Sequence, residues 1–120
     1  MDTMKTIEHK GRNIVLLDFV NADTAAVLRK IEEYKEIIAW QNVRSLLVLT
    51  DVTRCEINKK TVQAFKDFTA HNRPYVTASA TIGLSGSARI FVNIINQFSK
   101  RDIRHFSDPN SAKDWLVTHS

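Results

Sequence analysis

The stretch SLLVLTDV, residues 45–52, decides the fold, because it is the most continuously apolar segment of strand length in the chain. A strand that is apolar on both faces is typical of the centre of a sheet covered by helices on both sides. On either side of it, strand-like and helix-like segments alternate, which indicates a mostly parallel sheet with right-handed crossovers. We therefore expect an α/β fold in a single domain spanning residues 1–120.

Toward the N-terminus, residues 14–20 form an apolar, β-branched run of strand length. Residues 4–9 predict a further strand, joined to it by a turn at residues 10–13 that contains Gly11. This first strand would be an antiparallel edge. Between the two strong strands, capping residues at 21–24 precede an amphipathic helix that ends near residues 40–42. Its apolar residues recur at helical spacing: Val27, Leu28, Ile31, Tyr34 and Ile38.

Toward the C-terminus, Asn58 is placed to cap a second helix that ends at residues 71–74, before Pro74. Residues 75–83 alternate as a strand whose one face is more polar than the other. A third helix is expected over residues 86–100, with an inward face formed by Phe91, Ile94, Ile95 and Phe98.

A short strand at residues 103–106 follows, and Asp108-Pro109 opens a final helix. The predicted fold is thus a mixed, mostly parallel sheet with an antiparallel N-terminal strand and four helices. No linker or repeat interrupts it.

Composition limits the kind of protein this is. Apolar residues make up 43% and charged residues 25%, as in ordinary globular proteins. No apolar run approaches the roughly 18 residues that span a membrane, and residues 1–5 carry no signal-peptide core, so we expect a cytoplasmic protein without integral membrane association. The net charge of +4 is spread along the chain without interleaved aromatic residues, which argues against nucleic acid as a partner.

The single cysteine, Cys55, excludes an internal disulfide. Arg54 beside it would lower the pKa of its thiol. The histidines share no metal-ligand spacing with one another or with Cys55, so no metal or cofactor is expected. Asp18 and Asp51, at the ends of the strongest strands, are expected to cap loop N–H groups, with a role in a ligand site as the alternative. Trp40 and Trp115 are expected to pack against the core.

The stretch TIGLSGSAR, residues 81–89, allows three interpretations. It resembles the Gly-x-Ser-x-Gly elbow of serine hydrolases, with Ser87 in place of the last glycine and with Asp102 or Asp108 and His105 or His119 following in triad order. The chain is about half the length that such folds need. Neither phosphate-loop fingerprint is present, although backbone N–H groups at a helix start can hold an anion. The preferred interpretation is a tight joint between strand and helix, in which Ser85 caps the helix and Gly83 and Gly86 relieve crowding.

Nearly the whole chain resembles the SpoIIAA-like group of the STAS domain superfamily. The matching segments are GRNIVLLDFVNAD, SLLVLTDVT, HNRPYVTASATIGLSG, NIINQFS and FSDPNSAKDWL. The C-terminal half is more distantly similar to CRAL-TRIO lipid-binding domains. The resemblance implies a STAS-like fold and a non-enzymatic module, since STAS domains are generally regulatory and the best-known are switched by phosphorylation of a serine.

The sequence departs from the family at that serine. Ile57 and Asn58 match the Ile-Asp pair of the family's Ile-Asp-Ser-Ser-Gly pattern, but Lys59 and Lys60 replace both serines and Thr61 replaces the glycine. Thr61 or Thr53 could stand in for the serine, although neither matches it residue for residue. A serine-phosphorylation switch is therefore not expected.

Two functions follow as hypotheses, with the serine hydrolase as a third. The first is a cytosolic regulatory or protein-interaction module without catalysis, bound to a protein partner or a second copy. Its partner surface would be formed by Asp51, Thr53, Arg54, Asn58, Lys59, Lys60 and Thr61. The second is a binder of a small anionic or amphipathic, lipid-like ligand. That ligand would occupy the cleft between the central strand and the joint, at Gly83, Ser85, Gly86, Ser87, Phe91 and Ile95.

Overall fold

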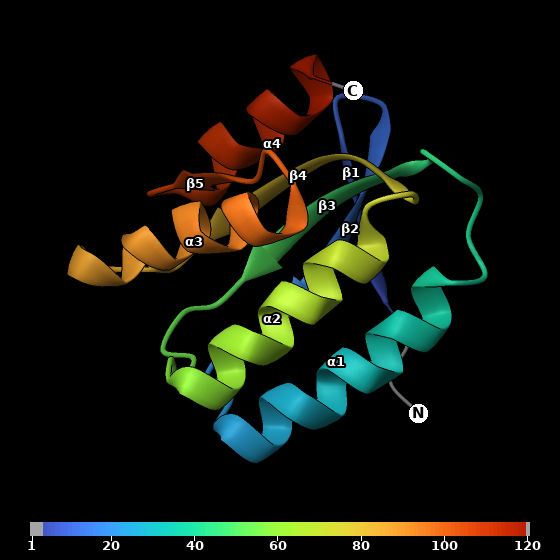
Figure 1. Cartoon of the computed structure of the whole chain (residues 1–120). Coiled ribbons are helices and arrows are strands. Elements are labelled where there is room, and N and C mark those ends of the chain that lie inside the picture. The colour runs from blue at the N-terminus through green and yellow to red at the C-terminus, as the bar shows by residue number, and fades with distance from the viewer. Residues whose placement is uncertain (1–3, 120) are drawn as a thin grey trace.

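A computed structural model describes residues 4–119 as one five-stranded sheet with helices on both faces (Figure 1). The elements in chain order are β1 (Lys5–His9), β2 (Arg12–Asp18), α1 (Thr24–Ile38), β3 (Leu46–Asp51), α2 (Lys59–Asn72), β4 (Val76–Ile82), the short 3₁₀ helix η1 (Gly86–Arg89), α3 (Ile90–Ser99), β5 (Arg104–Phe106) and α4 (Pro109–Thr118). The strands lie in the order β1-β2-β3-β4-β5.

Strand directions follow the prediction. β1 pairs antiparallel with β2, and the pairs β2–β3, β3–β4 and β4–β5 are parallel. The turn between β1 and β2 is Lys10-Gly11, with φ of 51° and 78°, the positive values that a tight two-residue hairpin needs. The expected mixed, mostly parallel sheet with an antiparallel N-terminal edge strand is therefore confirmed.

The central strand β3 is buried on both faces, as its composition predicts. Leu46 and Val48 belong to the core under α1 and α2, and Leu47 and Leu49 belong to the core under α4. On the first face α2 lies between α1 and α3 (Figure 1). The centre of that core is aromatic: Phe19 is fully buried and meets Tyr34, Phe65 and Phe68 edge to face.

Side-chain caps fix three of the helix starts. Asp23 and Asp108 accept hydrogen bonds from the backbone N–H groups of Ala26 and Ser111, and Pro109 stands in the first turn of α4. Asn58 begins α2 with a reciprocal capping box to Thr61. The predicted starts of the second and final helices are confirmed.

The third helix starts later than expected, because its segment begins as one 3₁₀ turn and α3 starts only at Ile90. Two predictions about packing are also wrong. Ile94 and Phe98, expected to face inward, are 36% and 52% exposed, and α3 buries Val92 and Ser99 instead. Trp40 is 85% exposed, so it does not pack against the core, whereas Trp115 packs as expected against the α4 core.

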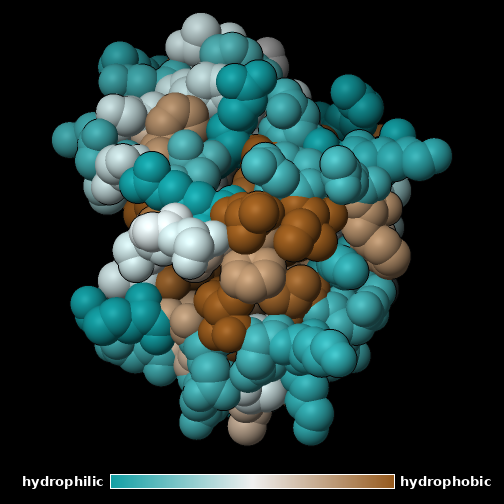
Figure 2. Space-filling model, turned by 60° about the vertical axis from the view of Figure 1, so that its left-hand side comes forward, coloured by the Kyte–Doolittle hydropathy of each residue, from teal (hydrophilic) through white to brown (hydrophobic). Residues whose placement is uncertain are grey.

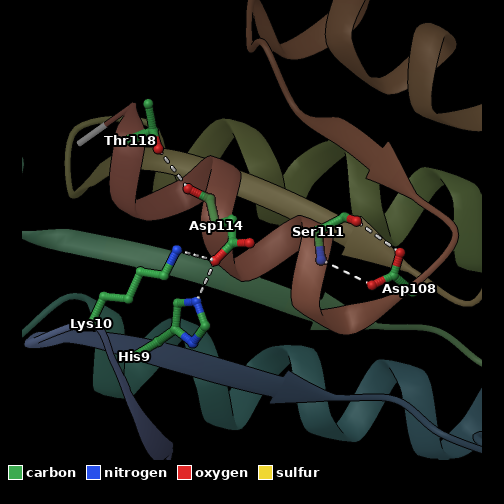
Figure 3. Close-up of polar contacts among 6 residues, drawn as sticks. All are labelled: His9, Lys10, Asp108, Ser111, Asp114 and Thr118. Carbon is green, nitrogen blue, oxygen red and sulfur yellow. Dashed lines mark hydrogen bonds and ion pairs between the residues drawn. The ribbon is translucent and has the colours of Figure 1, made fainter.

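Polar contacts attach α4 to the β1–β2 hairpin (Figure 3). Asp114 accepts from Nε2 of His9 at 2.7 Å and from Nζ of Lys10 at 2.9 Å. The hydrogen bond from His9 and that from Lys10 lower the pKa of Asp114. These contacts connect the edge hairpin with the last helix, although the two are far apart in sequence.

Candidate functional site

The joint after β4 is tight because two loops meet there. Gly83 has φ of +98°, and a Cβ at this position would lie 2.5 Å from the backbone nitrogen of Thr53. Thr53 is itself fixed, because its N–H and its hydroxyl both donate to Oδ1 of Asp51. Only glycine therefore fits at position 83, and the structure supports the interpretation of this stretch as a strand-to-helix joint.

The polar residues around the joint do not form a hydrolase triad. Ser85 occupies the position before η1, but its side chain makes no capping hydrogen bond, so the predicted cap is wrong. Nε2 of His105 accepts the backbone N–H of Leu84 at 3.1 Å, which uses the lone pair that a general base needs. Asp108 caps α4 and Asp102 pairs with Arg104. His119 stacks on Trp115.

The surroundings of His105 favour the neutral form of its ring. Burial lowers the pKa of its ring, and the nearby Arg89 guanidinium lowers the pKa further. A neutral ring can accept the Leu84 N–H, and a protonated ring cannot. The joint is thus attached to β5 by a bond that depends on the protonation state of one histidine.

Most polar side chains in the loops after β2 and β3 make hydrogen bonds within and between these two loops. The carboxylates of Asp18 and Asp51 accept loop N–H groups from Val20 and Thr53, as expected. Nε of Arg54 donates to Oδ1 of Asn21 at 2.6 Å. Of the residues predicted to form a partner surface, Asp51, Thr53 and Arg54 make these loop contacts, and Asn58 caps α2.

Two predictions about the segment from Cys55 to the first turn of α2 need correction. Thr61 is 0% exposed, so it cannot contribute to a partner surface or receive a phosphate in the folded protein. The pKa of Cys55 is raised to about 11, mainly by burial and to a smaller extent by the Glu56 carboxylate. The prediction that Arg54 lowers this pKa is therefore wrong. Lys59 and Lys60 remain exposed, at the start of α2.

A cavity of about 70 Å³ lies between the sheet, α2 and α3. Its lining is mainly apolar and brings together the joint, through Leu84, with Phe91 and Ile95 of α3 and with Ile57 and Val62 around the start of α2. The sequence placed Phe91 and Ile95 beside the joint in such a cleft, and the structure brings both to one cavity. Gly83, Ser85, Gly86 and Ser87 are not among the residues that line it.

The sheet side of the cavity also carries polar groups. Thr50, Ser79 and Thr81 line it from β3 and β4, and the guanidinium side chain of Arg101 lines it from the segment after α3. These residues were not identified as site residues from the sequence. For Ser79 and Thr81 a signal was nevertheless present, because the strand at residues 75–83 shows one polar face in a sheet that buries both faces.

Helix α3 has more apolar surface than the cavity and core can cover. Successive residues turn by about 100° around a helix, so Ile90, Ile94 and Phe98 form a stripe beside the cavity-lining Phe91 and Ile95. We call Ile90, Ile94 and Phe98 the α3 stripe; all three are exposed. In Figure 2 the molecule is turned so that the α3 side of Figure 1 comes forward. This face shows an apolar patch ringed by hydrophilic side chains.

None of the helices over residues 4–119 has the length and apolar character needed to cross a bilayer. Over the same residues, no group of three or more histidine, cysteine or carboxylate side chains could hold a metal ion.

No family model and no curated protein matches the sequence. Among solved structures, the fold is similar to that in a crystal structure of an uncharacterised protein from the DUF3478 family with a SpoIIAA-like fold, from Shewanella loihica PV-4. The TM-score is 0.69 at 13% identity, and the match covers 95% of this chain and 92% of that chain. The chain therefore has the SpoIIAA-like fold expected from its resemblance to STAS domains, whereas the similarity to CRAL-TRIO domains has no support.

Proposed function

We propose that the protein is a non-catalytic binding module whose ligand is a small amphipathic molecule held between α2, α3 and the sheet. The observation that carries the proposal is the cavity, with apolar walls from both helices and hydroxyl groups on its sheet side. Small-molecule sites in proteins combine mostly apolar walls with a few polar groups in this way. The SpoIIAA-like fold is generally found in non-enzymatic modules, which agrees with a binding role.

The size of the cavity sets how such a ligand would lie. About 70 Å³ is far below the roughly 300 Å³ at the lower end of ligand pockets, so the cavity holds the polar head and the first carbons of an amphiphile. The rest of an alkyl chain would follow Phe91 and Ile95, which are half-buried, out to the exposed α3 stripe. Covering that stripe removes apolar surface from water, which favours binding.

Octanoate is a suitable probe, and thermal unfolding is a suitable measurement. A ligand that binds only the folded protein, at about ten times its Kd, raises Tm by several degrees. Ile95→Trp fills the cavity and should remove this shift. Asn93→Trp, at an exposed position of α3 outside both the cavity and the α3 stripe, should retain it. An equal shift in both variants, or no shift in the unsubstituted protein, would contradict the proposal.

A second candidate function is a regulatory interaction with a second copy of the chain, and the α3 stripe favours it. Three large apolar side chains on one exposed helix face are a feature of surfaces that meet a partner. Lys66 lies over the ring of Phe98, 5.3 Å from its centroid, so the stripe has a cationic border. Sedimentation of the protein with and without Phe98→Ser tests this role. Self-association that the substitution abolishes supports it, and a monomer at all concentrations contradicts it.

A further inference from the structure

The segment that follows α3 places a cation at the cavity. Lys100 ends α3 in a left-handed conformation, with φ of 54°, and Arg101 comes next. The Arg101 side chain is partly buried, and Nη1 donates to the backbone carbonyl of Thr69 at 2.9 Å. The other N–H donors of the guanidinium have no acceptor among the described residues. Arg101 thus lines the cavity with donor capacity to spare.

No carboxylate within the described chain neutralises this cation. Asp102, its neighbour in sequence, pairs with Arg104 at 3.4 Å. The positive charge of Arg73 repels that of Arg101. Burial is the larger cause and this repulsion is the smaller one, and together they lower the pKa of Arg101 to about 10. A partly buried cation without a counter-ion is costly, and an anion brought by a ligand would offset that cost.

Polar groups near Arg101 would complete a head-group site. Ser79 and Asn72 line the same cavity and are only 7% and 4% exposed. The Ser79 hydroxyl makes no hydrogen bond with any other described residue. With Nη1 bonded to Thr69, the free edge of the guanidinium presents two parallel N–H groups, which match the two oxygens of a carboxylate.

Building on the proposed ligand site, we propose that Arg101 selects amphipathic ligands whose head group is a carboxylate. The carboxylate lies against the free edge of the Arg101 guanidinium, within reach of the Ser79 hydroxyl. The alkyl chain runs between α2 and α3 past Ile95 and Phe91. Ligands with a neutral head of the same length fill the same apolar space but leave the guanidinium without a counter-ion.

The test compares octanoate with 1-octanol in ¹H–¹⁵N NMR titrations of the full chain, which include the Nε–H signal of Arg101. We expect octanoate to bind at least about tenfold more tightly than octanol and to shift the Arg101 Nε–H signal. Arg101→Gln should remove this preference. Arg73→Gln, a nearby exposed arginine that does not line the cavity, should keep it.

Each other outcome has a separate meaning. Equal binding of octanoate and octanol, or a preference that survives Arg101→Gln, overturns the carboxylate selection while leaving the ligand site in place. Binding of neither probe overturns the ligand site itself.

An outer cleft also contacts Arg101, together with Trp115 and His119. If octanoate changes the chemical shifts of Trp115 and His119 alone, the carboxylate lies in that cleft and the inference is overturned. The comparison on the unsubstituted protein does not depend on any variant folding.

Discussion

The backbone N–H of Leu84 donates a hydrogen bond to Nε2 of His105, 3.1 Å away, and this bond attaches the joint after β4 to the last strand of the sheet. Leu84 also lines the cavity, so the bond positions one wall of the proposed site. It exists only while the His105 ring is neutral, which makes the joint sensitive to pH.

Acid should weaken the protein through His105. Since the folded pKa lies below the ordinary value of 6.5, the fold favours the neutral ring. Its contribution is full above about pH 6.5 and is lost as the pH falls through the folded pKa. Urea denaturation at pH 7.5 should show His105→Ala less stable by about 1 kcal/mol, and the difference should shrink by pH 5.

His105→Gln is the matched control, because its side-chain oxygen can accept the same N–H at every pH. The acid sensitivity that Asp108 and Asp114 cause is common to all three proteins and cancels in the comparison. A constant difference between His105→Ala and the unsubstituted protein from pH 7.5 to 5 would show that this bond is not pH-sensitive.

Gly83→Ala should destabilise the fold far more than Gly86→Ala. At position 83 the new Cβ meets the Thr53 backbone nitrogen at 2.5 Å, whereas at position 86, with φ of +53°, it meets nothing within 4 Å. We expect losses in the free energy of unfolding of at least about 2 kcal/mol for the first and about 1 kcal/mol for the second. Equal losses in urea denaturation would mean that the approach of Thr53 is not what requires glycine.

Asn58→Ala should lower the free energy of unfolding by about 1 kcal/mol, because the Thr61 N–H loses the Asn58 Oδ1 acceptor 3.0 Å away. Asn58→Ser keeps a capping oxygen without placing a second carboxylate beside Glu56, and it should retain most of the stability. Thermal unfolding of the three proteins distinguishes these cases. If Asn58→Ser is as unstable as Asn58→Ala, the cap is not the cause.

Cys55 should react slowly with alkylating reagents. Its pKa is raised from 9.0 to about 11, which lowers the fraction of reactive thiolate at pH 8 by about 100-fold. Iodoacetamide should therefore modify the folded protein about 100 times more slowly than the chain unfolded in urea. Arg54→Gln should leave the rate unchanged, since Arg54 bonds to Asn21; a slower reaction in that variant would restore a role for Arg54.

The sequence predicted the fold well because local signals agreed with the overall architecture. The doubly buried pattern of β3 located the centre of the sheet, and Asn58 and Asp108 marked two helix starts. The error at α3 has a physical cause. Its apolar sector is wider than the surface that α2 and the sheet can cover, so periodicity alone could not show that Ile94 and Phe98 stay exposed.

The candidate site was only half predictable. Phe91 and Ile95 could be placed beside the joint because they lie on the helix that follows it. Arg101 could not, because nothing in the sequence shows that the chain after α3 turns back to bring this side chain to Thr69. The residues predicted as a partner surface were chosen from their place after the central strand. That reasoning could not anticipate the local bonds of Thr53 and Arg54 or the burial of Thr61.

The most direct test of the central claim is native mass spectrometry of the protein purified gently from its own cells. We expect a fraction of the protein to carry one small organic molecule, which is retained by Asn93→Trp and lost by Ile95→Trp. A protein of bare mass, or an adduct that both variants retain equally, would contradict a ligand held between α2, α3 and the sheet.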